Sequence, residues 1–302
     1  MNSLPFSQPG NWYRGNLHTH SSNSDGNMSP REVCAAYRRR GYHFISLTDH
    51  FKEDYGFPIS DTAPYRSAGF TTIFGAELHA PKTSRGDLWH ILAVGLPLEF
   101  KPTAARETGP QVAARAAAAG AYVVVAHPAW YDLTDRDVLS LKAATAIEIA
   151  NTTVQALNGK GDSNGYLDRL LSQGGDYHAI ATDDAHFKPS RSDFARNWVV
   201  VRSKTLAPEP LLAALHAGSF YSSQGPEILA VKPGRGGKQL AVRTTAVRSM
   251  WLTGSGPRAA FVSAEKDITS AQLDLGVVEG GYARLTVADS RGRKAWTNPF
   301  RL

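Results

Sequence analysis

The stretch FISLTDH, residues 44–50, carries the pattern that decides the fold: a short apolar run ends directly in Asp49 and His50. Six further apolar runs follow along the chain, separated by segments with helical spacing. Strands that alternate with helices in this way are typical of βα units around a parallel sheet. The six runs are TTIFGA (71–76), HILAVGL (90–96), YVVVA (122–126), AIEIA (146–150), YHAIAT (177–182) and NWVVV (197–201).

Capping residues mark the helices between these runs. Ser29 followed by Pro30 predicts an N-cap and the first turn of a helix that ends at Gly41. Glycines that follow apolar-periodic segments predict further helix ends, because glycine accepts the left-handed conformation common there. The other expected helices are 111–119, a segment near 135–144, 166–173 and 208–217.

Residues that bind metal ions follow four of the predicted strands. In a parallel β/α barrel the C-terminal strand ends open onto one face, so residues distant in sequence converge there. The pattern therefore predicts a functional site at that face. The residues concerned are Asp49, His50, Glu77, His127, Asp183, Asp184 and His186.

The N-terminal segment adds His18 and His20, whose spacing places both imidazoles on one side of an extended chain. A single His-x-His pattern has a structural interpretation as well as a ligand one, and the accumulation of histidines favours the ligand one. Six of the ten histidines lie in or at the ends of predicted strands: His18, His20, His50, His90, His127 and His186. The remaining four, His43, His79, His178 and His216, are interpreted as structural.

The predicted secondary structure changes after Gly225 and Pro226, where alternating strands and glycine turns replace the helices. The sequence predicts a barrel domain over 1–225 and a small antiparallel, sandwich-like β module over 226–302. A chain of 302 residues that is 42% hydrophobic is long enough for a large and a small core.

Composition restricts the chemistry and the partners. The single cysteine, Cys34, excludes a disulfide framework and a thiolate site within the chain, so a metal site must use nitrogen and oxygen ligands. No apolar run of 18 residues and no secretion signal is present, so we expect a soluble cytoplasmic enzyme with no membrane contact.

The net charge of +6 is carried by the C-terminal module. Residues 1–225 hold 21 basic and 21 acidic side chains, whereas 226–302 hold 12 and 6. This imbalance admits a nucleic-acid hypothesis, but aromatic side chains for base stacking are sparse in the module. A solvated basic surface is the favoured interpretation, and nucleic acid is not the expected partner.

Five motifs together resemble the PHP (polymerase and histidinol phosphatase) superfamily. They are HTHSSNSDG at 18–26, LTDH at 47–50, GAE at 75–77, AHP at 126–128 and DDAH at 183–186. The C-terminal AWTNPFRL is similar to the ending of the CehA/McbA-type branch, so the resemblance extends over nearly the whole chain. It implies an α/β fold, a distorted (β/α)7-type barrel, with a centre of about three divalent cations at the strand ends.

The resemblance also implies a ligand set, carried over motif by motif. Glu77 is implied as a carboxylate that bridges the first two metals. His18, His20, Glu77 and Asp184 would hold the first metal, Glu77, His90 and His127 the second, and Asp25, His50 and His186 the third. All of these ligands suit manganese, iron or zinc.

Other residues have open assignments. Asp184 is preferred to Asp183 because of the Asp-x-His spacing before the final histidine. Asp49 either accepts the second ring hydrogen of a ligating histidine or caps the next turn. His79 is a candidate leaving-group acid, and Arg191 or Arg85 a candidate phosphate clamp.

The function that follows is a metal-dependent hydrolase. Three divalent cations against three carboxylates leave an excess of positive charge, which favours a small anionic phosphoester attacked by a metal-bridging hydroxide. A carbamate or ester hydrolase of the CehA/McbA type is the alternative, because the same centre serves attack on a carbonyl carbon. A non-catalytic metal-binding interaction module is the third possibility. No heptad or exposed apolar stripe indicates an oligomeric state.

Substrate identity is expected to depend on the loops at 51–70, 81–89, 128–136 and 151–165. Within or beside them, Tyr55, Tyr65, Trp130 and Tyr131 either line the pocket or pack against it.

Overall fold

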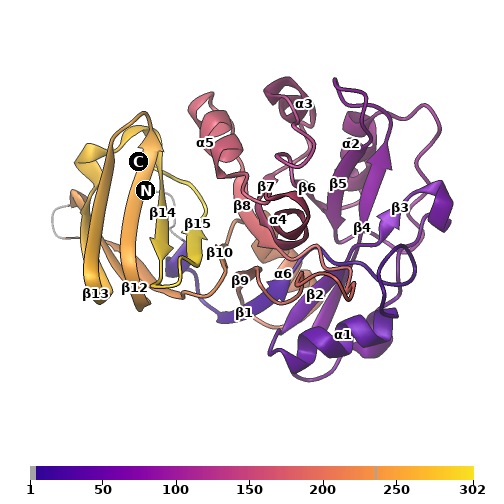
Figure 1. Ribbon diagram of the computed structural model, residues 1–302, viewed down its shortest axis with the longest axis horizontal. Coiled ribbons are helices and arrows are strands. Elements are labelled where there is room, and N and C mark those ends of the chain that lie inside the picture. The colour runs from indigo at the N-terminus through magenta and orange to yellow at the C-terminus, as the bar shows by residue number, and fades with distance from the viewer. Residues whose placement is uncertain (1–4, 235–236) are drawn as a thin grey trace.

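The computed structural model describes residues 5–234 and 237–302 as a mixed α/β chain (Figure 1). The helices are α1 (Pro30–Arg39), α2 (Gly109–Ala118), α3 (Asp135–Ser140), α4 (Thr152–Asn158), α5 (Asn164–Ser172) and α6 (Pro208–His216). Within the described residues, 3-10 turns lie at Pro5–Ser7, Glu53–Tyr55, Ala63–Tyr65 and Leu275–Val277.

The strands follow the predicted order along the chain, with additional members at both ends of the barrel portion. Those of the N-terminal part are β1 (Asn11–Asn16), β2 (Phe44–Leu47), β3 (His50–Phe51), β4 (Thr71–Ala80), β5 (Trp89–Val94), β6 (Tyr122–Val125), β7 (Ala146–Asn151), β8 (His178–Thr182), β9 (Trp198–Ser203) and β10 (Phe220–Ser223). Those of the C-terminal part are β11 (Ile228–Pro233), β12 (Gln239–Ser255), β13 (Ala259–Asp274), β14 (Glu279–Ala288), β15 (Lys294–Thr297) and β16 (Phe300–Arg301).

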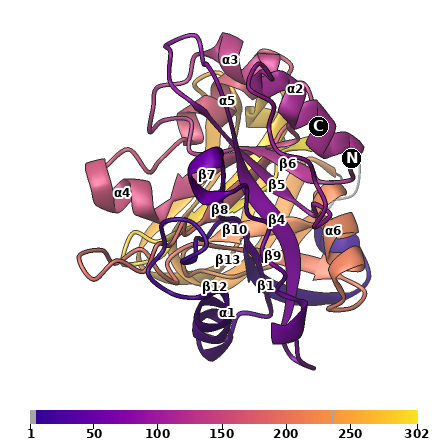
Figure 2. The same ribbon diagram turned by 90° about the vertical axis from the view of Figure 1, so that its right-hand side faces the viewer.

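The sheet of the barrel portion runs in the order β10-β9-β1-β2-β4-β5-β6-β7-β8. Parallel pairs join β1 to β2, β2 to β4, β6 to β7 and β7 to β8. Figure 2 shows α1, α2, α3, α4 and α6 around the outside of these strands. The strands therefore carry buried apolar side chains, as in Tyr122–Val125, where all four residues are buried.

Two of the predicted strands depart from the expected parallel arrangement. β9 pairs antiparallel with β1 and with β10. β5 pairs antiparallel with β4 and with β6, so it runs against its neighbours. The consequence concerns His90, which lies near the start of β5 and pairs with His79 of β4. Because β5 is reversed, its N-terminal end lies at the edge where the C-terminal ends of β4 and β6 lie.

The sheet is open in its backbone pairing. Over residues 5–234 and 237–302, no backbone ladder joins β8 to β9 or β10. Side chains bridge this seam instead: the Ser222 hydroxyl donates to the Ala179 carbonyl at 2.8 Å and accepts from the Ala181 N–H at 3.0 Å. Asn298, from the C-terminal end of the chain, accepts from the Ala179 N–H at 2.8 Å. The expected (β/α)7-type barrel is thus distorted to the point of lacking backbone closure.

The first helix forms as its sequence predicts. Ser29 accepts from the Glu32 N–H, and the Glu32 carboxylate accepts from the Ser29 N–H at 2.8 Å, a reciprocal capping box. The helix buries Val33 and Tyr37 on one face, against the β2 residue Ile45. The four buried residues of the helix are Val33, Cys34, Ala36 and Tyr37. Their spacing of three and four residues places them on its inner side.

Several elements were not expected from the sequence. β1, β3 and β10 are short strands, and polar residues break the apolar patterns of β1 and β10. The helix α4 lies within the segment 151–165, which we expected to be a loop. The Asn151 side chain caps α4 by accepting from the Val154 N–H at 2.8 Å. A helix of seven residues is too short to show apolar periodicity, so the cap was the available signal.

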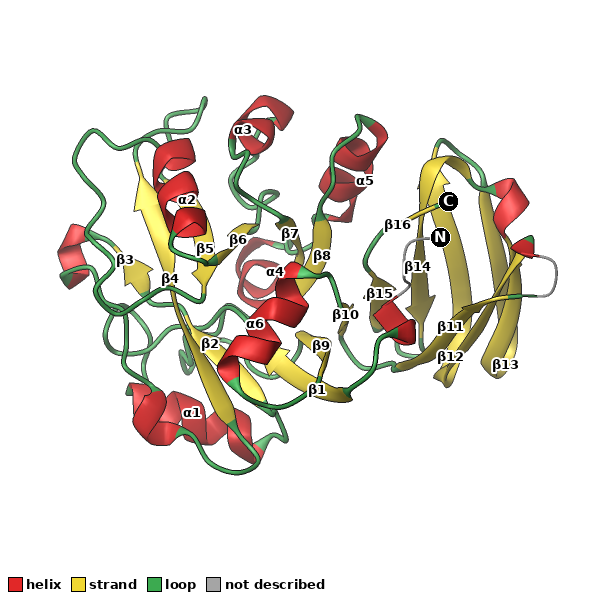
Figure 3. Cartoon of the chain, turned by 180° about the vertical axis from the view of Figure 1, so that it is seen from behind, coloured by secondary structure: helices red, strands yellow, loops and turns green. Residues whose placement is uncertain are grey.

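The C-terminal strands β11 to β14 form an antiparallel group (Figure 3). Their core includes Val242, Met250, Leu252 and Leu285, and it extends to Tyr221 of β10. β15 pairs with both β14 and β10, so the sheet continues from the module into the barrel. The boundary at residue 225 stays a prediction. No described helix is long and apolar enough to cross a membrane.

A buried ion pair links the module to the barrel. Arg284 of β14 is only 4% exposed and donates to both carboxylate oxygens of Asp168 on α5, at 2.7 and 2.6 Å. The same guanidinium donates to the Asn164 side chain at 2.9 Å. Such a two-pronged contact fixes the orientation of both side chains.

Candidate metal centre

All nine predicted metal ligands lie together at one edge of the barrel sheet. They form overlapping groups of nitrogen and oxygen atoms that lie within 4.8 Å of one another. The groups are His20, Asp25, His50 and His186; His50, Glu77, His79 and His90; His18, His127 and Asp184; and His18, His20 and Glu77. The convergence predicted from the strand ends is therefore what the structure has.

Glu77 is the centre of the cluster. Its Oε1 lies 2.8 Å from His90 Nδ1, 3.2 Å from His127 Nε2 and 3.7 Å from His18 Nε2. Its Oε2 lies 2.6 Å from His50 Nδ1 and 3.7 Å from His20 Nε2. One carboxylate with each oxygen facing its own set of imidazoles has the geometry of a ligand that bridges two cations.

The first group is built around Asp184. Its Oδ1 lies 2.9 Å from His20 Nε2 and 3.2 Å from His18 Nε2. Both histidines follow β1, and Thr19 between them forms a bridge with Ala185 that aligns the two segments. The spacing in the sequence thus places both rings toward the same carboxylate.

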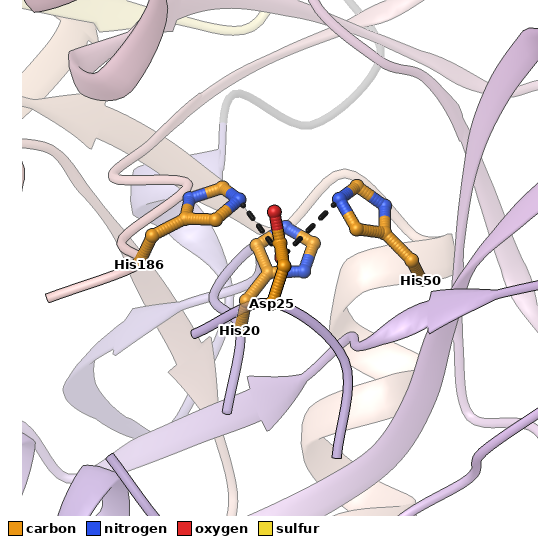
Figure 4. A group of neighbouring side chains, drawn as sticks. All are labelled: His20, Asp25, His50 and His186. Atoms are coloured by element: carbon orange, nitrogen blue, oxygen red, sulfur yellow. Dashed lines mark ion pairs between the residues drawn. The ribbon is translucent and has the colours of Figure 1, made fainter. Parts of the chain in front are cut away.

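The group of His20, Asp25, His50 and His186 is shown in Figure 4. Asp25 Oδ1 lies 3.3 Å from His186 Nε2 and 3.5 Å from His50 Nε2. The loop that carries Asp25 folds back on itself, with the Gly26 N–H donating to the Ser21 carbonyl at 2.9 Å. A Cβ at Gly26 would lie 2.6 Å from the His20 carbonyl oxygen, so this tight turn requires glycine.

Glu148 is a member of the site that the sequence analysis missed. It is fully buried on β7, and its Oε1 accepts from His18 Nδ1 at 2.9 Å, while the Thr182 hydroxyl also contacts Oε1. Its Oε2 accepts from the His127 N–H at 2.7 Å and from Asn151 at 2.9 Å. The available signal was one carboxylate within the apolar run AIEIA, since a buried charge needs partners.

The two adjacent aspartates point to different networks. Asp183 accepts from the N–H groups of Ala195, Arg196 and Asn197, each at 2.8 Å, and from the Tyr37 hydroxyl at 2.9 Å. Burial raises the pKa of Asp183 to about 6 against the opposing effect of these hydrogen bonds. Because its oxygens are engaged there, the contacts favour Asp184 as the ligand.

Asp49 contacts no histidine that the structure describes. Its oxygens accept from the Ser21 N–H at 2.7 Å and from the hydroxyls of Ser21, Ser24 and Ser60 at 2.8, 2.8 and 3.0 Å. These contacts match neither alternative for Asp49, because its carboxylate fixes the loop that carries Asp25 instead of a histidine or the next turn. Accepting the second ring hydrogen of a clustered histidine falls to Glu148 instead.

His79 lies within the cluster, whereas Arg191 lines the cavity beside it. His79 is buried, with its Nε2 2.9 Å from His50 Nδ1, and so belongs to a group of potential ligands rather than to the core alone. Arg191 lines the cavity above the cluster, and Arg85 is exposed and does not line it. Of the two arginines, the geometry favours Arg191 as the clamp.

The donor set fits divalent metal ions. Several buried atoms that face the cluster, including His18 Nε2, Glu77 Oε2 and Asp25 Oδ1, lie close to oppositely charged or titratable groups but form no aligned hydrogen bond among the described residues. The rings are also packed closely, with centroids 4.2 Å apart for His20 and His186. Neutral imidazoles that share cations tolerate this spacing, and all donors are the nitrogen and oxygen types that Mn, Fe and Zn accept.

The electrostatics of the cluster favour positive charge at its centre. Burial alone would raise the pKa of Glu77, but the neighbouring His50, His90 and His18 rings lower it well below its usual value. Burial lowers the pKa of His20 to about 4, assisted by His186 and His50. Burial would also lower the pKa of His186, but Asp25 and Asp184 raise it to about 9. The carboxylates therefore stay ionised, and their negative charge stabilises protons on neighbouring rings or metal ions between them.

A cavity of about 190 Å³ opens above the cluster. Besides the predicted ligands, the cavity is lined by Trp130, by Thr153, Val154 and Leu157 of α4, and by Arg191. Trp130 lies edge-on to His90 and His127, with ring centroids 5.2 and 5.1 Å apart. The short helix α4 is thus part of the cavity wall.

Comparison with solved structures shows the fold. A two-domain protein of Bacteroides vulgatus that contains a predicted PHP-like metal-dependent phosphoesterase aligns over 98% of this chain and 97% of its own, with 16% identity and a TM-score of 0.55. A protein of Bifidobacterium adolescentis described as a metal-dependent phosphoesterase aligns over 58% and 89%, with 17% identity and a TM-score of 0.45. An amidohydrolase of Chromobacterium violaceum with bound sulfate and no metal aligns over 57% and 87%, also with 17% identity and a TM-score of 0.45.

Neither a family model nor a curated protein sequence matches the chain. The mixed α/β fold class is confirmed, and so is the resemblance to PHP-type proteins at the level of the fold, over both the barrel and the module. The CehA/McbA branch stays a prediction.

Proposed function

We propose that this PHP-type chain is a metal-dependent hydrolase, and that its substrate is a small phosphoester. The observation that carries the proposal is the position of Glu77, whose two oxygens face separate sets of imidazoles. A central carboxylate with donors on both sides suits two cations close together, and the Asp25 group suits a third. Manganese, iron and zinc all fit these donors.

Such cations would supply two things: a water made acidic enough to act as nucleophile near neutral pH, and stabilisation of negative charge in the transition state. In the hydrolysis, water oxygen bonds to phosphorus, the bond from phosphorus to the alcohol oxygen breaks, and that oxygen takes up a proton. The charge of the phosphoester substrate matches the positive excess expected for the loaded site.

Individual residues have defined tasks in this proposal. Glu148 holds His18 in one tautomer, because a ring that donates its Nδ1–H keeps a free lone pair on Nε2. Asp49 fixes the loop of Asp25. Arg191 reaches the cavity from its rim and would pair with the phosphate oxygens.

His79 is the candidate for the acid that protonates the leaving group. Burial and the neighbouring His90 lower the pKa of His79 well below its usual value, so its imidazole is neutral near pH 7. A neutral imidazole with a low pKa is a poor general acid. The position of His79 beside His50 and Glu77 therefore supports a ligand or positioning task more than proton donation.

A carbamate or ester hydrolase is the second candidate. The observation that favours it is the apolar side of the cavity, Trp130 and Leu157, which suits a neutral substrate as well as the apolar part of a charged one. The metal chemistry would serve attack on a carbonyl carbon equally well.

Metal analysis together with a substrate panel tests the proposal. Purified protein is assayed for bound Mn, Fe and Zn, and for turnover of p-nitrophenyl phosphate, p-nitrophenyl acetate and an aryl carbamate. We expect at least two metal equivalents, turnover of the phosphate and inhibition by inorganic phosphate. His20→Ala should lose metal and turnover, whereas His216→Ala, which changes an exposed histidine on α6, should lose neither.

Each contrary outcome has a defined meaning. Turnover of the carbamate or acetate without the phosphate would replace the phosphoester proposal by the second candidate. Metal binding without turnover of any substrate would favour an interaction module. Fewer than two metal equivalents, with His20→Ala unchanged, would contradict the multinuclear centre.

A further inference from the structure

The cavity at the metal centre is lined by two unlike sets of side chains. One set consists of the clustered histidines and carboxylates, and the other, here called the upper side, includes the apolar Trp130, Val154 and Leu157. A phosphoester placed with its phosphorus at the cluster would direct the rest of its structure toward the upper side. The chemistry of that side therefore limits the alcohol part of the substrate.

Trp130 and Leu157 are not explained by core packing. Leu157, near the end of the short helix α4, is 48% exposed. Trp130 is partly exposed and lies outside the buried core clusters. Its neighbour Tyr131 does pack against the core. An indole and a leucine side chain left beside a cavity offer apolar surface to a ligand.

The upper side offers few polar groups to a substrate. The Thr153 hydroxyl is already engaged, donating to the Asp184 carbonyl at 2.6 Å with Asp193 at 3.2 Å. Among the lining side chains other than the predicted ligands, the remaining donors are Arg191 and the indole N–H of Trp130. A polyol would leave several hydroxyls without partners there, and each would cost about 1–3 kcal/mol.

We propose that the substrate is a phosphomonoester of an apolar, planar alcohol whose ring packs against the apolar surface of Trp130 and Leu157. This inference rests on the proposed phosphoesterase function and adds the class of leaving group. An aromatic ring fits because stacked and edge-to-face ring contacts contribute beyond the area that they bury. A sugar or glycerol phosphate is disfavoured by the shortage of polar partners.

Two pairs of compounds test the inference in the metal-loaded protein. The first pair is benzyl phosphate and glycerol 3-phosphate, both esters of alkyl alcohols, compared by kcat/KM. The second pair is benzylphosphonate and 2-hydroxyethylphosphonate, which are not hydrolysed, compared by calorimetric binding. We expect the benzyl compound to be favoured at least about tenfold in each pair, the scale of one aromatic contact.

The variants are Trp130→Ala and Leu157→Asn, with Leu139→Asn as the matched control. Leu139 is 43% exposed on α3 and does not line the cavity. Both cavity variants should reduce the benzyl preference about fivefold or more, whereas the control should retain it. Metal content is measured for each protein, because Trp130 packs on His90 and His127, and Leu157→Asn keeps the test valid if Trp130→Ala loses metal.

The outcomes separate the inference from the function on which it rests. Turnover of both phosphates with equal kcat/KM, or a preference untouched by Leu157→Asn, would overturn the inference and leave the phosphoesterase proposal standing. If neither benzyl phosphate nor glycerol 3-phosphate is hydrolysed, the phosphoesterase proposal is contradicted. In that case equal binding of the two phosphonates would also overturn the apolar-ring inference, and tighter binding of benzylphosphonate would support it.

Discussion

Glu148 and His18 lie 130 positions apart in the sequence and are joined by a hydrogen bond of 2.9 Å between Oε1 and Nδ1. Both side chains are fully buried. The contact directs His18 Nε2 toward Asp184 and Glu77. One buried carboxylate thus orients a ring of the cluster without belonging to the groups of potential ligands.

Glu148→Gln should weaken metal binding. The amide can accept from His18 but carries no charge, so the ring loses the negative partner that makes Nε2 a stronger donor. We expect metal affinity to fall by about tenfold or more, the usual effect of removing such a partner. Competition with a chromogenic chelator measures it, and Glu209→Gln, at an exposed position on α6, is the control. Equal affinities for wild type and Glu148→Gln would contradict the assignment.

The two adjacent aspartates should respond differently to replacement by asparagine. Asp184→Asn should reduce the number of metal ions bound, because Asp184 Oδ1 faces both His18 and His20. Asp183→Asn should keep the metal but lower the free energy of unfolding by about 2 kcal/mol, because the Asp183 oxygens accept three backbone N–H groups. Elemental analysis and urea unfolding distinguish the two. The reverse pattern would make Asp183 the ligand.

Arg284→Met should destabilise the contact between module and barrel. The guanidinium is buried, while the Asp168 side chain is 39% exposed, so solvent compensates part of the loss. We expect a decrease of about 2 kcal/mol in the free energy of unfolding, below the range for fully buried pairs. Arg248→Met, which breaks an ion pair between half-exposed partners, should change it by about 0.5 kcal/mol or less. Equal effects of the two variants in urea unfolding would contradict this reading of the contact.

His178 predicts a dependence of stability on pH that does not involve the metal cluster. Burial, partly opposed by Asp176 and assisted by His216, lowers the pKa of His178 to about 4. The Tyr122 hydroxyl lies 3.0 Å from its Nδ1. Between pH 6.5 and 4 the unfolded chain binds a proton at this residue that the folded chain does not, so stability decreases as the pH falls.

His178→Gln should remove this component. At pH 4 the wild type should have lost up to about 3 kcal/mol more unfolding free energy than the variant, relative to pH 7.5, since one pKa unit corresponds to about 1.4 kcal/mol. Urea unfolding of both proteins in the presence of a chelator measures the difference without a contribution from metal loading. Parallel pH profiles would show that His178 titrates normally in the folded chain.

Much of the secondary structure is readable from local sequence. Each of the seven apolar runs predicted as strands overlaps a strand with at most two residues outside it, and the Ser29 capping box begins α1 as expected. These features depend on residues a few positions apart, whose spacing is visible in the chain. The sequence did not predict the strands β1 and β10 or the helix α4, because these elements are short and mix polar with apolar residues.

The direction of β5 was not readable. Its composition is the same whether it runs parallel or antiparallel, because direction is set by hydrogen bonding to β4 and β6. This direction decides the site, since it brings His90 from the start of its strand to within 2.8 Å of Glu77.

By itself the sequence determined that nitrogen and oxygen donors follow the strands of an α/β fold and that they would meet at one edge. Spacing within short motifs and the geometry of parallel strands suffice for that conclusion. The tertiary structure alone decided which groups stand behind the donors: Glu148 behind His18, and Asp49 in the loop of Asp25. Those contacts depend on hydrogen bonds between residues far apart in the chain. The Asp-x-His spacing favoured Asp184 over Asp183, whereas a lone glutamate in an apolar run has no local pattern that reveals its partner.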